Sequence, residues 1–229
     1  MRSCLIILLV MLLGFTNYSK GQEKKAYRLF DAKGKEIEYK EMMKVLKAQD
    51  VVFIGEVHNC AIAHWLEYEM VKDLHTAHKD KLTIGLEMLE ADNQLMVDEY
   101  VGRLISSDRF EEEARLWPNY LTDYAPVVGL GREHGLRVIA TNVPRRGFEA
   151  LEKLSAEAKK YIAPLPIDYE PDEEAAGMFG LMMMTSGKHT DPENVAKAQA
   201  LKDATMGWFI AQNLKSKFVH LNGNYHSDF

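Results

Sequence analysis

Apolar residues gather in four short runs, and polar residues follow each run at once. Such runs, bounded by turn residues, are typical of buried strands. Between them, apolar residues recur at helical spacing, as in the stretch from Ile62 to Leu74. Strands that alternate with helices favour a parallel sheet. The sequence therefore predicts an α/β fold, a central and mostly parallel sheet flanked by helices in three layers. The expected strands are 51–54 (fully buried), 81–86, 136–140 and 217–221.

Other elements follow from the same patterns. Residues 27–30 and 36–39 flank a Gly-containing turn and predict a hairpin. Trp117, Tyr120 and Tyr124 recur at intervals of three and four, so we expect them to line one side of a helix, either as core or around a ligand. The Met-rich stretch 173–185 suits core gaps or a large flat apolar ligand. The expected helices cover 39–48, 61–75, 92–104, 123–134 and 192–214.

The first residues are typical of a secretory signal peptide. Arg2 precedes an apolar run from Leu5 to Phe15, and a small-x-small site ends at Gly21. We expect residues 1–21 to be removed and 22–229 to form a single α/β domain, the alternative being an N-terminal membrane anchor. Cys4 precedes the apolar run, so no lipidation motif is present. The expected location is periplasmic or in the cell envelope. The strand pattern implies a further helix after 217–221, so either the chain is a fragment or the sheet closes without one.

The net charge and the cysteine content argue against a nucleic-acid partner and against an internal disulfide. The formal charge is −6, and removal of Arg2 and Lys20 makes it −8. An acidic chain argues against a nucleic-acid partner, which would favour a basic face. Removal of residues 1–21 leaves Cys60 alone, so we expect no internal disulfide. Cys60 is interpreted as a small buried residue rather than a nucleophile.

Polar side chains follow all four expected strands. The carboxyl ends of parallel strands meet at one edge of a sheet, where ligands bind in open α/β folds. Three of these side chains, His58, Glu87 and His226, are suitable ligands for a divalent metal ion. Without a metal, a Glu orients a His that takes a proton from water, and Arg145 stabilises an oxyanion, as in ester or amide hydrolysis. The converging residues are Glu56, His58, Glu87, Arg145 and His226, with Asn142, Asn222 and Asp228 nearby.

Several short motifs occur in a specific order. They are GEVHN at 55–59, His64, GLEML at 85–89, Trp117 with Tyr120 and Tyr124-x-Pro126, NVPR at 142–145, Gln199 with Asp203 and Met206, and GNYH at 223–226. From residue 51 onward the chain resembles the ChaN-like family of haem-binding, iron-regulated proteins. Its superfamily also holds the TIKI and TraB proteins and the erythromycin esterases. Two departures are the single His at 63–64, where the family often has a pair, and the missing lipidation Cys.

The resemblance implies haem binding outside the cytoplasm, for haem or iron uptake or storage. It also implies a homodimer that encloses haem, with a tyrosine as iron ligand, and an outer-membrane haem receptor as a partner. A tyrosinate is a reasonable single axial ligand for ferric iron. The hydrolytic branches imply the alternative, a metal-dependent or Glu/His-based hydrolase. The expected haem contacts are Tyr124, Tyr120 and then Tyr225 for iron, His64 or Arg145 for the propionates, and Met182 for the macrocycle.

Overall fold

The computed structural model describes residues 24–145, 155–167 and 192–227. Contacts divide the chain into two compact units, Met1–Ile37 and Glu38–Phe229. In the first unit, β1 (Leu29–Phe30) pairs antiparallel with β2 (Glu36–Ile37). The Asp31 carboxylate accepts hydrogen bonds from two backbone N–H groups of the turn. The predicted hairpin is therefore confirmed, with shorter strands. A single domain over 22–229 stays a prediction.

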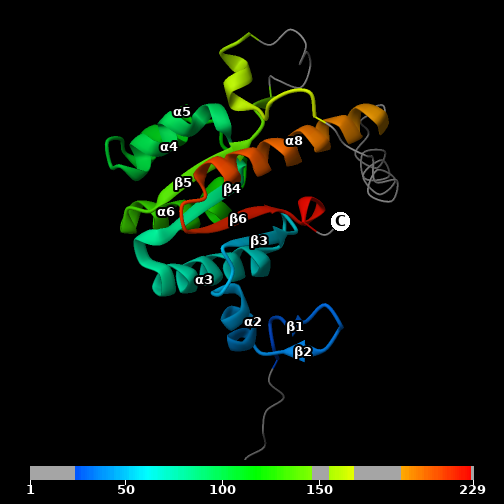
Figure 1. Ribbon diagram of the computed structural model, residues 1–229. Helices are drawn as coiled ribbons and strands as arrows, with labels where there is room; N and C mark the ends of the chain where they lie inside the picture. Colours follow the sequence, from blue (N-terminus) through cyan, green and yellow to red (C-terminus); the bar gives the residue numbers. More distant parts are fainter. Residues whose placement is uncertain (1–23, 146–154, 168–191, 228–229) are drawn as a thin grey trace, which may run out of the picture. The chain divides into compact units, whose positions relative to one another are not determined.

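The second unit contains a four-stranded sheet whose described strands all run parallel. The order across the sheet is β3 (Val51–Glu56), β6 (Lys217–Gly223), β4 (Leu82–Glu90) and β5 (Arg137–Asn142). The last strand in sequence therefore lies inside the sheet, between β3 and β4 (Figure 1). This arrangement confirms the predicted α/β class with a parallel sheet.

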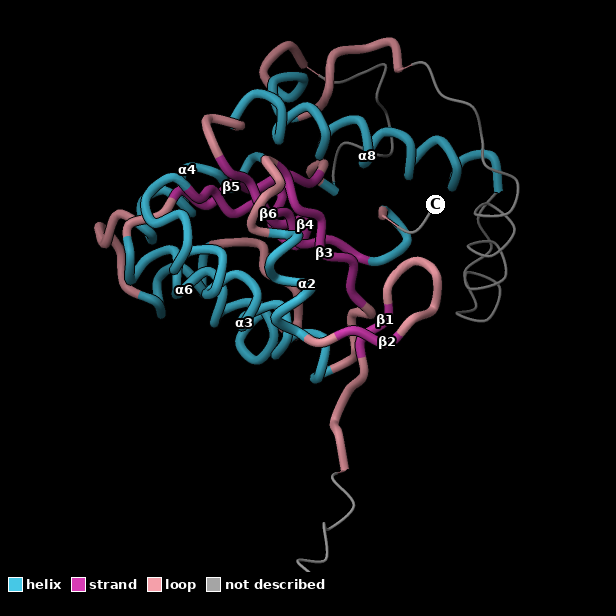
Figure 2. The backbone as a smooth tube through the Cα atoms, turned by 60° about the horizontal axis from the view of Figure 1, so that its bottom comes forward, coloured by secondary structure: helices cyan, strands magenta, loops and turns pink. Residues whose placement is uncertain are grey.

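Helices cover both faces of this sheet (Figure 2). On one face, Val71 and Leu74 of α3 (Ala61–His78) and Val127 of α6 (Ala125–His134) enter the main apolar core. On the other, Ile210 of α8 (Pro192–Asn213) packs in a second apolar cluster with Phe218. The unit is therefore three-layered, as predicted. The remaining helices and helical turns are α2 (Tyr39–Leu46), η1 (Lys79–Lys81), η2 (Ala91–Asn93), α4 (Gln94–Val101), α5 (Ser107–Glu113), η3 (Tyr120–Tyr124), η6 (Ala158–Tyr161) and η7 (Asn224–His226).

Three strands extend further than their apolar runs. β4 continues through Glu87 to Glu90, β5 includes Asn142, and β6 continues to Gly223. Each of these residues is buried. Periodicity ends a strand where polar residues begin, but here hydrogen bonds hold the polar groups inside the sheet. Glu87, for example, accepts a hydrogen bond from the Gly223 N–H of the neighbouring strand.

The prediction that 51–54 is fully buried is wrong. β3 alternates, with Val52 and Ile54 buried and Phe53 54% exposed. β3 lies at an edge of the described sheet, and α8 packs against β5 and β4. In the part of the chain that the structure describes, the Phe53 face of β3 therefore stays open.

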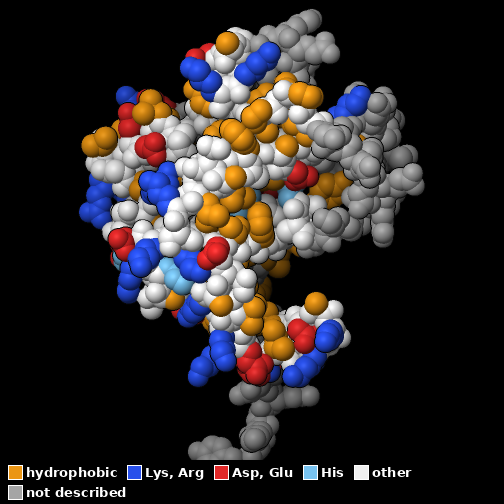
Figure 3. Space-filling view, in the orientation of Figure 1, with side chains coloured by type: hydrophobic (Ala, Val, Ile, Leu, Met, Phe, Trp, Pro, Cys, Tyr) orange, Lys and Arg blue, Asp and Glu red, His pale blue; other side chains and the backbone are white. Residues whose placement is uncertain are grey.

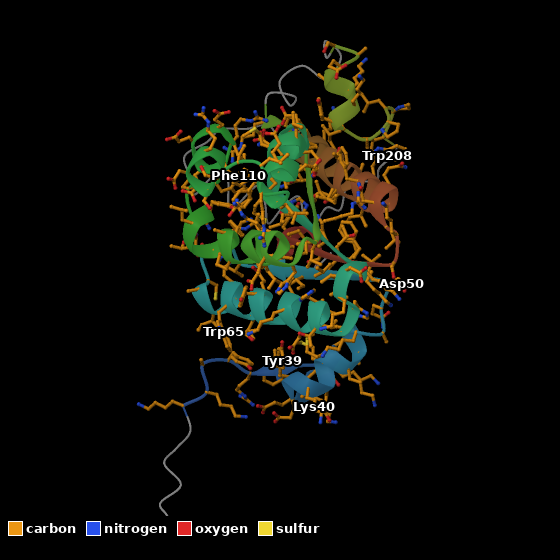
Figure 4. All side chains as sticks on the ribbon, turned by 90° about the vertical axis from the view of Figure 1, so that its left-hand side faces the viewer. Tyr39, Lys40, Asp50, Trp65, Phe110 and Trp208 are labelled. Atoms are coloured by element: carbon orange, nitrogen blue, oxygen red, sulfur yellow. The ribbon has the colours of Figure 1, made fainter. Side chains whose placement is uncertain are left out.

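The aromatic positions belong to the core. Tyr120 and Tyr124 begin and end a π-helical turn, and both are buried. Phe110 of α5, labelled in Figure 4, is fully buried and stacks on Tyr100 with ring centroids 4.5 Å apart. The tyrosine spacing therefore reflects packing against this core. Among the described helices, none has the length and apolarity needed to cross a membrane.

Candidate functional site

The Glu56 carboxylate is the centre of one polar cluster at the end of β3. Its Oε1 accepts a hydrogen bond of 2.7 Å from the Tyr124 hydroxyl. The same oxygen lies 2.6 Å from His58 Nδ1. Glu56 is 2% exposed, whereas the His58 side chain is 41% exposed. Glu56 therefore fixes the half-exposed imidazole at the surface from below.

His64 connects Glu56 to the first turns of α3. Its Nδ1 lies 3.0 Å from Glu56 Oε2 and 3.2 Å from Glu67 Oε2. Its Nε2 lies 3.1 Å from the His58 carbonyl oxygen and 3.4 Å from Asp123 Oδ2. Because a carbonyl oxygen only accepts hydrogen bonds, Nε2 carries a hydrogen. The backbone of the loop after β3 therefore holds His64, while the side chain of His58 in that loop points outward.

Burial and hydrogen bonds together shift the pKa values of the side chains in this cluster. Burial, and then the neighbouring Glu56 carboxylate, raises the pKa of Glu67 to about 9. Burial opposes the ionisation of Glu56, but hydrogen bonds, first from His58 and also from Tyr124, hold its pKa below the usual range. Burial and the hydrogen bond to Glu56 raise the pKa of Tyr124. At neutral pH Glu56 is therefore ionised, while Tyr124 keeps its proton.

Glu87 is the centre of a second cluster. It is 2% exposed, and its Oε2 accepts a 2.8 Å hydrogen bond from Gly223 N–H. Its Oε1 lies 3.3 Å from His226 Nε2, and His226 Nδ1 lies 2.6 Å from Asp203 Oδ1 on α8. The imidazole thus lies between two carboxylates, with Lys202 Nζ 4.0 Å from Glu87 Oε1.

This arrangement favours an ion pair inside the protein. Burial opposes both charges, but the hydrogen bonds that His226 donates to Asp203 and Glu87 raise its pKa to about 9. Burial alone would raise the pKa of Glu87, but the hydrogen bond and charge of His226, with the Lys202 charge and the Gly223 hydrogen bond, together lower it to about 2. At neutral pH the second cluster therefore holds an imidazolium and a carboxylate.

The two clusters meet at Gly223. A Cβ atom added there would lie 2.8 Å from both Cε1 and Nε2 of His58, and 3.6 Å from Glu87 Oε2. The His58 ring therefore packs against the Gly223 α-carbon, and a side chain at position 223 would require the ring to shift. The structure brings Glu56, His58, Glu87 and His226 to one edge of the sheet. Their catalytic role, and metal binding by His58, Glu87 and His226, stay predictions.

Arg145 does not join this group, which corrects the expected convergence. It follows β5, and β6 and β4 separate that strand from β3. Its Nε lies 3.4 Å from Glu90 Oε1, and its side chain is 70% exposed. It lines a pocket of about 520 Å³ together with Glu90, Ala114, Arg115 and Leu116. The Arg115 guanidinium pairs there with Glu90 and Asp92.

Both clusters lie in a region of the chain that matches a known protein family. The family described as "Haem-binding uptake, Tiki superfamily, ChaN" matches residues 42–229, which is most of the chain and contains both clusters. The chain belongs to this family. The resemblance deduced from the motifs is therefore confirmed. A comparison with curated proteins gives no match.

One solved structure shares the fold of this chain. The structure titled "Cofacial heme binding to ChaN of Campylobacter jejuni" matches with a TM-score of 0.67 and 17% identity, over 87% of this chain and 80% of that one. The RRSP effector domain of a MARTX toxin from Vibrio vulnificus matches with a TM-score of 0.47 and 20% identity, over 81% of this chain and 30% of that one.

The haem contacts expected for a ChaN-family chain lie in different places. Tyr124 and Tyr120 are 0% and 4% exposed, so their hydroxyls lie in the interior. His64 is also buried, within the Glu56 cluster. Tyr225 in η7 is partly exposed, and its ring lies edge-on to that of His226 at 5.8 Å. Met182, the Met-rich stretch and Asp228 lie outside the described residues.

Some site residues were not predicted from sequence. Glu67 lies one helical turn after His64, a spacing that places both on one face of α3. Asp203 was assigned to its helix and to the family motif, but its contact with His226 depends on how α8 crosses the sheet. His220 is buried between Thr141 and Asn222, which lie 2.8 and 3.0 Å from its ring nitrogens. The crossing of α8 explains the Asp203 contact, and the strand order explains the contact between His220 and Thr141.

Proposed function

We propose that this chain binds haem and serves haem or iron uptake. The observation that carries the proposal is the match to the haem-binding uptake family over residues 42–229. The Campylobacter ChaN structure, whose title describes cofacial haem binding, supports it through the shared fold. These comparisons favour haem binding over the hydrolase alternative.

An open apolar surface beside the polar edge of the sheet is a candidate binding surface for the haem macrocycle. On the face shown in Figure 3, hydrophobic side chains gather along α8 and beside β6. Phe53 on the neighbouring β3 is 54% exposed, and Trp208 on α8, labelled in Figure 4, is 39% exposed. Exposed apolar side chains that cluster are typical of binding sites. In this proposal haem lies against the Phe53 face of β3.

The turn η7 borders this surface. Gly55 lies two residues beyond Phe53, so the two residues face the same side of β3. A Cβ atom added at Gly55 would lie 3.1 Å from the Asn224 α-carbon, which places the start of η7 directly on Gly55. Tyr225 follows Asn224 and is partly exposed. Tyr225 therefore borders the same face as Phe53.

Among the three tyrosines suggested by the sequence, Tyr225 is the best candidate for the iron ligand. An iron-bound tyrosinate must lose its proton and reach the metal. Burial raises the pKa of both Tyr120 and Tyr124, and the hydrogen bond to Glu56 raises that of Tyr124 further. Both residues therefore resist the change that ligation requires, whereas Tyr225 lies at the site edge.

Export and assembly complete the proposal. The signal-peptide pattern in residues 1–21 supports export to the periplasm or cell envelope. We further propose the partners that the resemblance implies, a second copy of the chain that encloses haem with it and an outer-membrane haem receptor. Fractionation of expressing cells tests export, and light scattering with and without haemin tests the dimer.

Haem binding is tested by titration of the purified chain with haemin, read by absorbance. We expect a saturable spectrum of the tyrosinate-ligated type. Tyr225→Phe should weaken binding at least tenfold and change the spectrum. Tyr68→Phe is the matched control, because Tyr68 lies on α3 with its ring under Lys72. Unsaturable binding by the unmodified chain would overturn the proposed function. A normal titration of Tyr225→Phe would overturn only the assignment of the ligand.

A further inference from the structure

We infer that Glu56, His64 and Glu67 form a buried binding site for a divalent transition-metal ion such as Zn²⁺. The site connects the end of β3 to the first turns of α3. One nitrogen or oxygen atom from each residue lies within 4.8 Å of the others, and all three residues are buried. This set differs from the His58, Glu87 and His226 set that the sequence suggests. It does not depend on haem binding.

The hydrogen bonding of His64 calls for a cation. Its Nε2 hydrogen is directed to the His58 carbonyl oxygen at 3.1 Å. In a neutral imidazole, Nδ1 then has a lone pair and no hydrogen. That lone pair faces carboxylate oxygens of Glu56 and Glu67, at 3.0 and 3.2 Å. Three electron-rich atoms then face one another, and either a proton or a metal ion between them would relieve the repulsion.

Two carboxylate oxygens of the cluster have no hydrogen-bond partner. Glu56 Oε2 and Glu67 Oε1 are both fully buried and without one. Although Glu56 Oε2 lies near His64 Nδ1, the two are not aligned for a hydrogen bond. Buried oxygens without partners are costly, because they lose water and gain nothing. A cation bound beside His64 Nδ1 would supply a partner for Glu56 Oε2, which lies 3.0 Å from that nitrogen.

The surroundings resemble the outer shell of a metal site. Metal-ligating histidines usually donate their other ring N–H to a carbonyl or carboxylate, as His64 does toward His58 O and Asp123. Glu56 Oε1 accepts from the Tyr124 hydroxyl, which fixes the carboxylate and directs Oε2 toward His64. The ligands are therefore oriented before any ion binds.

The chemistry of the ligands selects the class of ion. One imidazole and two carboxylates suit Zn²⁺ and its first-row neighbours better than Ca²⁺, which prefers six or more oxygens. With bonds of about 2.1 Å, a tetrahedral ion keeps its ligand atoms about 3.4 Å apart. The observed separations of 3.0 and 3.2 Å need only a small expansion.

A proton is the competing occupant. A protonated Glu67 carboxyl would also place a hydrogen between the three groups. The two occupants predict different responses to zinc. A proton-balanced cluster gives no stoichiometric uptake, whereas a metal site takes up one ion and gains thermal stability.

The test is zinc binding by the full chain after treatment with a chelator. We expect one Zn²⁺ per chain by elemental analysis, a zinc-dependent rise in Tm, and X-ray absorption that shows one imidazole nitrogen and carboxylate oxygens. Even outer-shell changes cost 10–100-fold in metal affinity, so we expect Glu67→Gln to lower zinc affinity at least about tenfold. Glu69→Gln is the matched control, because Glu69 lies on the same helix, partly exposed and 3.6 Å from Lys72.

Further results would overturn the site. One is the absence of stoichiometric zinc in the unmodified chain, which needs no variant and so does not depend on the folding of Glu67→Gln. Another is equal zinc affinity in folded Glu67→Gln and Glu69→Gln. The last is loss of zinc binding in His75→Ala, because His75 and His134 stack on the surface with ring centroids 4.2 Å apart and offer a different histidine pair.

Discussion

The Tyr124 hydroxyl donates a 2.7 Å hydrogen bond to Glu56 across 68 residues of sequence. Tyr124 belongs to the core, and Glu56 carries a buried charge. One hydrogen bond therefore connects the packing of the π-helical turn to the polar edge of the sheet.

The first prediction concerns this bond. Tyr124→Phe removes one of the groups that stabilise the ionised Glu56, and should lower the free energy of unfolding by about 1.5–3 kcal/mol. Urea denaturation measures this. Tyr68→Phe, which leaves Glu56 untouched, should change stability by less. If both variants unfold at the same urea concentration, the hydrogen bond contributes nothing to stability.

The second prediction concerns pH. The pKa of His226 is raised from its ordinary value of 6.5 to about 9, so its stabilising effect is complete below pH 6.5 and is lost as pH rises through 9. The pKa of Glu87 is lowered from 4.5 to about 2, so its effect is complete above pH 4.5 and is lost toward pH 2. The pair should therefore stabilise the fold most between pH 4.5 and 6.5.

His226→Gln tests the alkaline side of this window. The difference in unfolding free energy between the unmodified chain and the variant should shrink by about 1–3 kcal/mol between pH 6.5 and 9.5. The lower part of this range allows for solvent screening at Asp203, whose side chain is 51% exposed. A difference that stays constant across this interval would contradict the raised pKa.

The third prediction compares two glycines. A Cβ atom at Gly85 would lie 2.5 Å from Phe218 Cε1 and 2.8 Å from His220 Cδ2, so Gly85→Ala should destabilise the sheet by about 1–3 kcal/mol. Gly129 in α6 has nothing within 4 Å of that position. Gly129→Ala should therefore stabilise the fold by about 0.5–1 kcal/mol. Thermal unfolding of the two variants should show shifts of opposite sign.

The periodicity of apolar residues predicts the elements of this fold well, but it does not predict where each strand ends or which strand face is exposed. The four strands, the long α3 and α8 and the three layers follow from apolar spacing. The exposure of Phe53 does not, because it depends on which strand lies at the edge and where α8 crosses. Glu87 was expected after a strand and lies within one, since Gly223 of the neighbouring strand satisfies its carboxylate.

The site shows the same limit. Glu56, His58, Glu87 and His226 could be predicted to meet, because parallel strands bring their carboxyl ends together. Arg145 was misplaced, because sequence gives the order of strands along the chain but not across the sheet. Tyr120 and Tyr124 carry a helical spacing that core and ligand-binding residues share, and only their burial distinguishes the two.

The contact between the His58 ring and the Gly223 α-carbon makes the two polar clusters a thermodynamically linked pair. A ligand that displaces His58 from the Gly223 side must also move its Nδ1 relative to Glu56. This coupling acts in both directions. An ion bound to Glu56 changes the affinity of the chain for that ligand, and the ligand changes the affinity of the chain for the ion by the same factor.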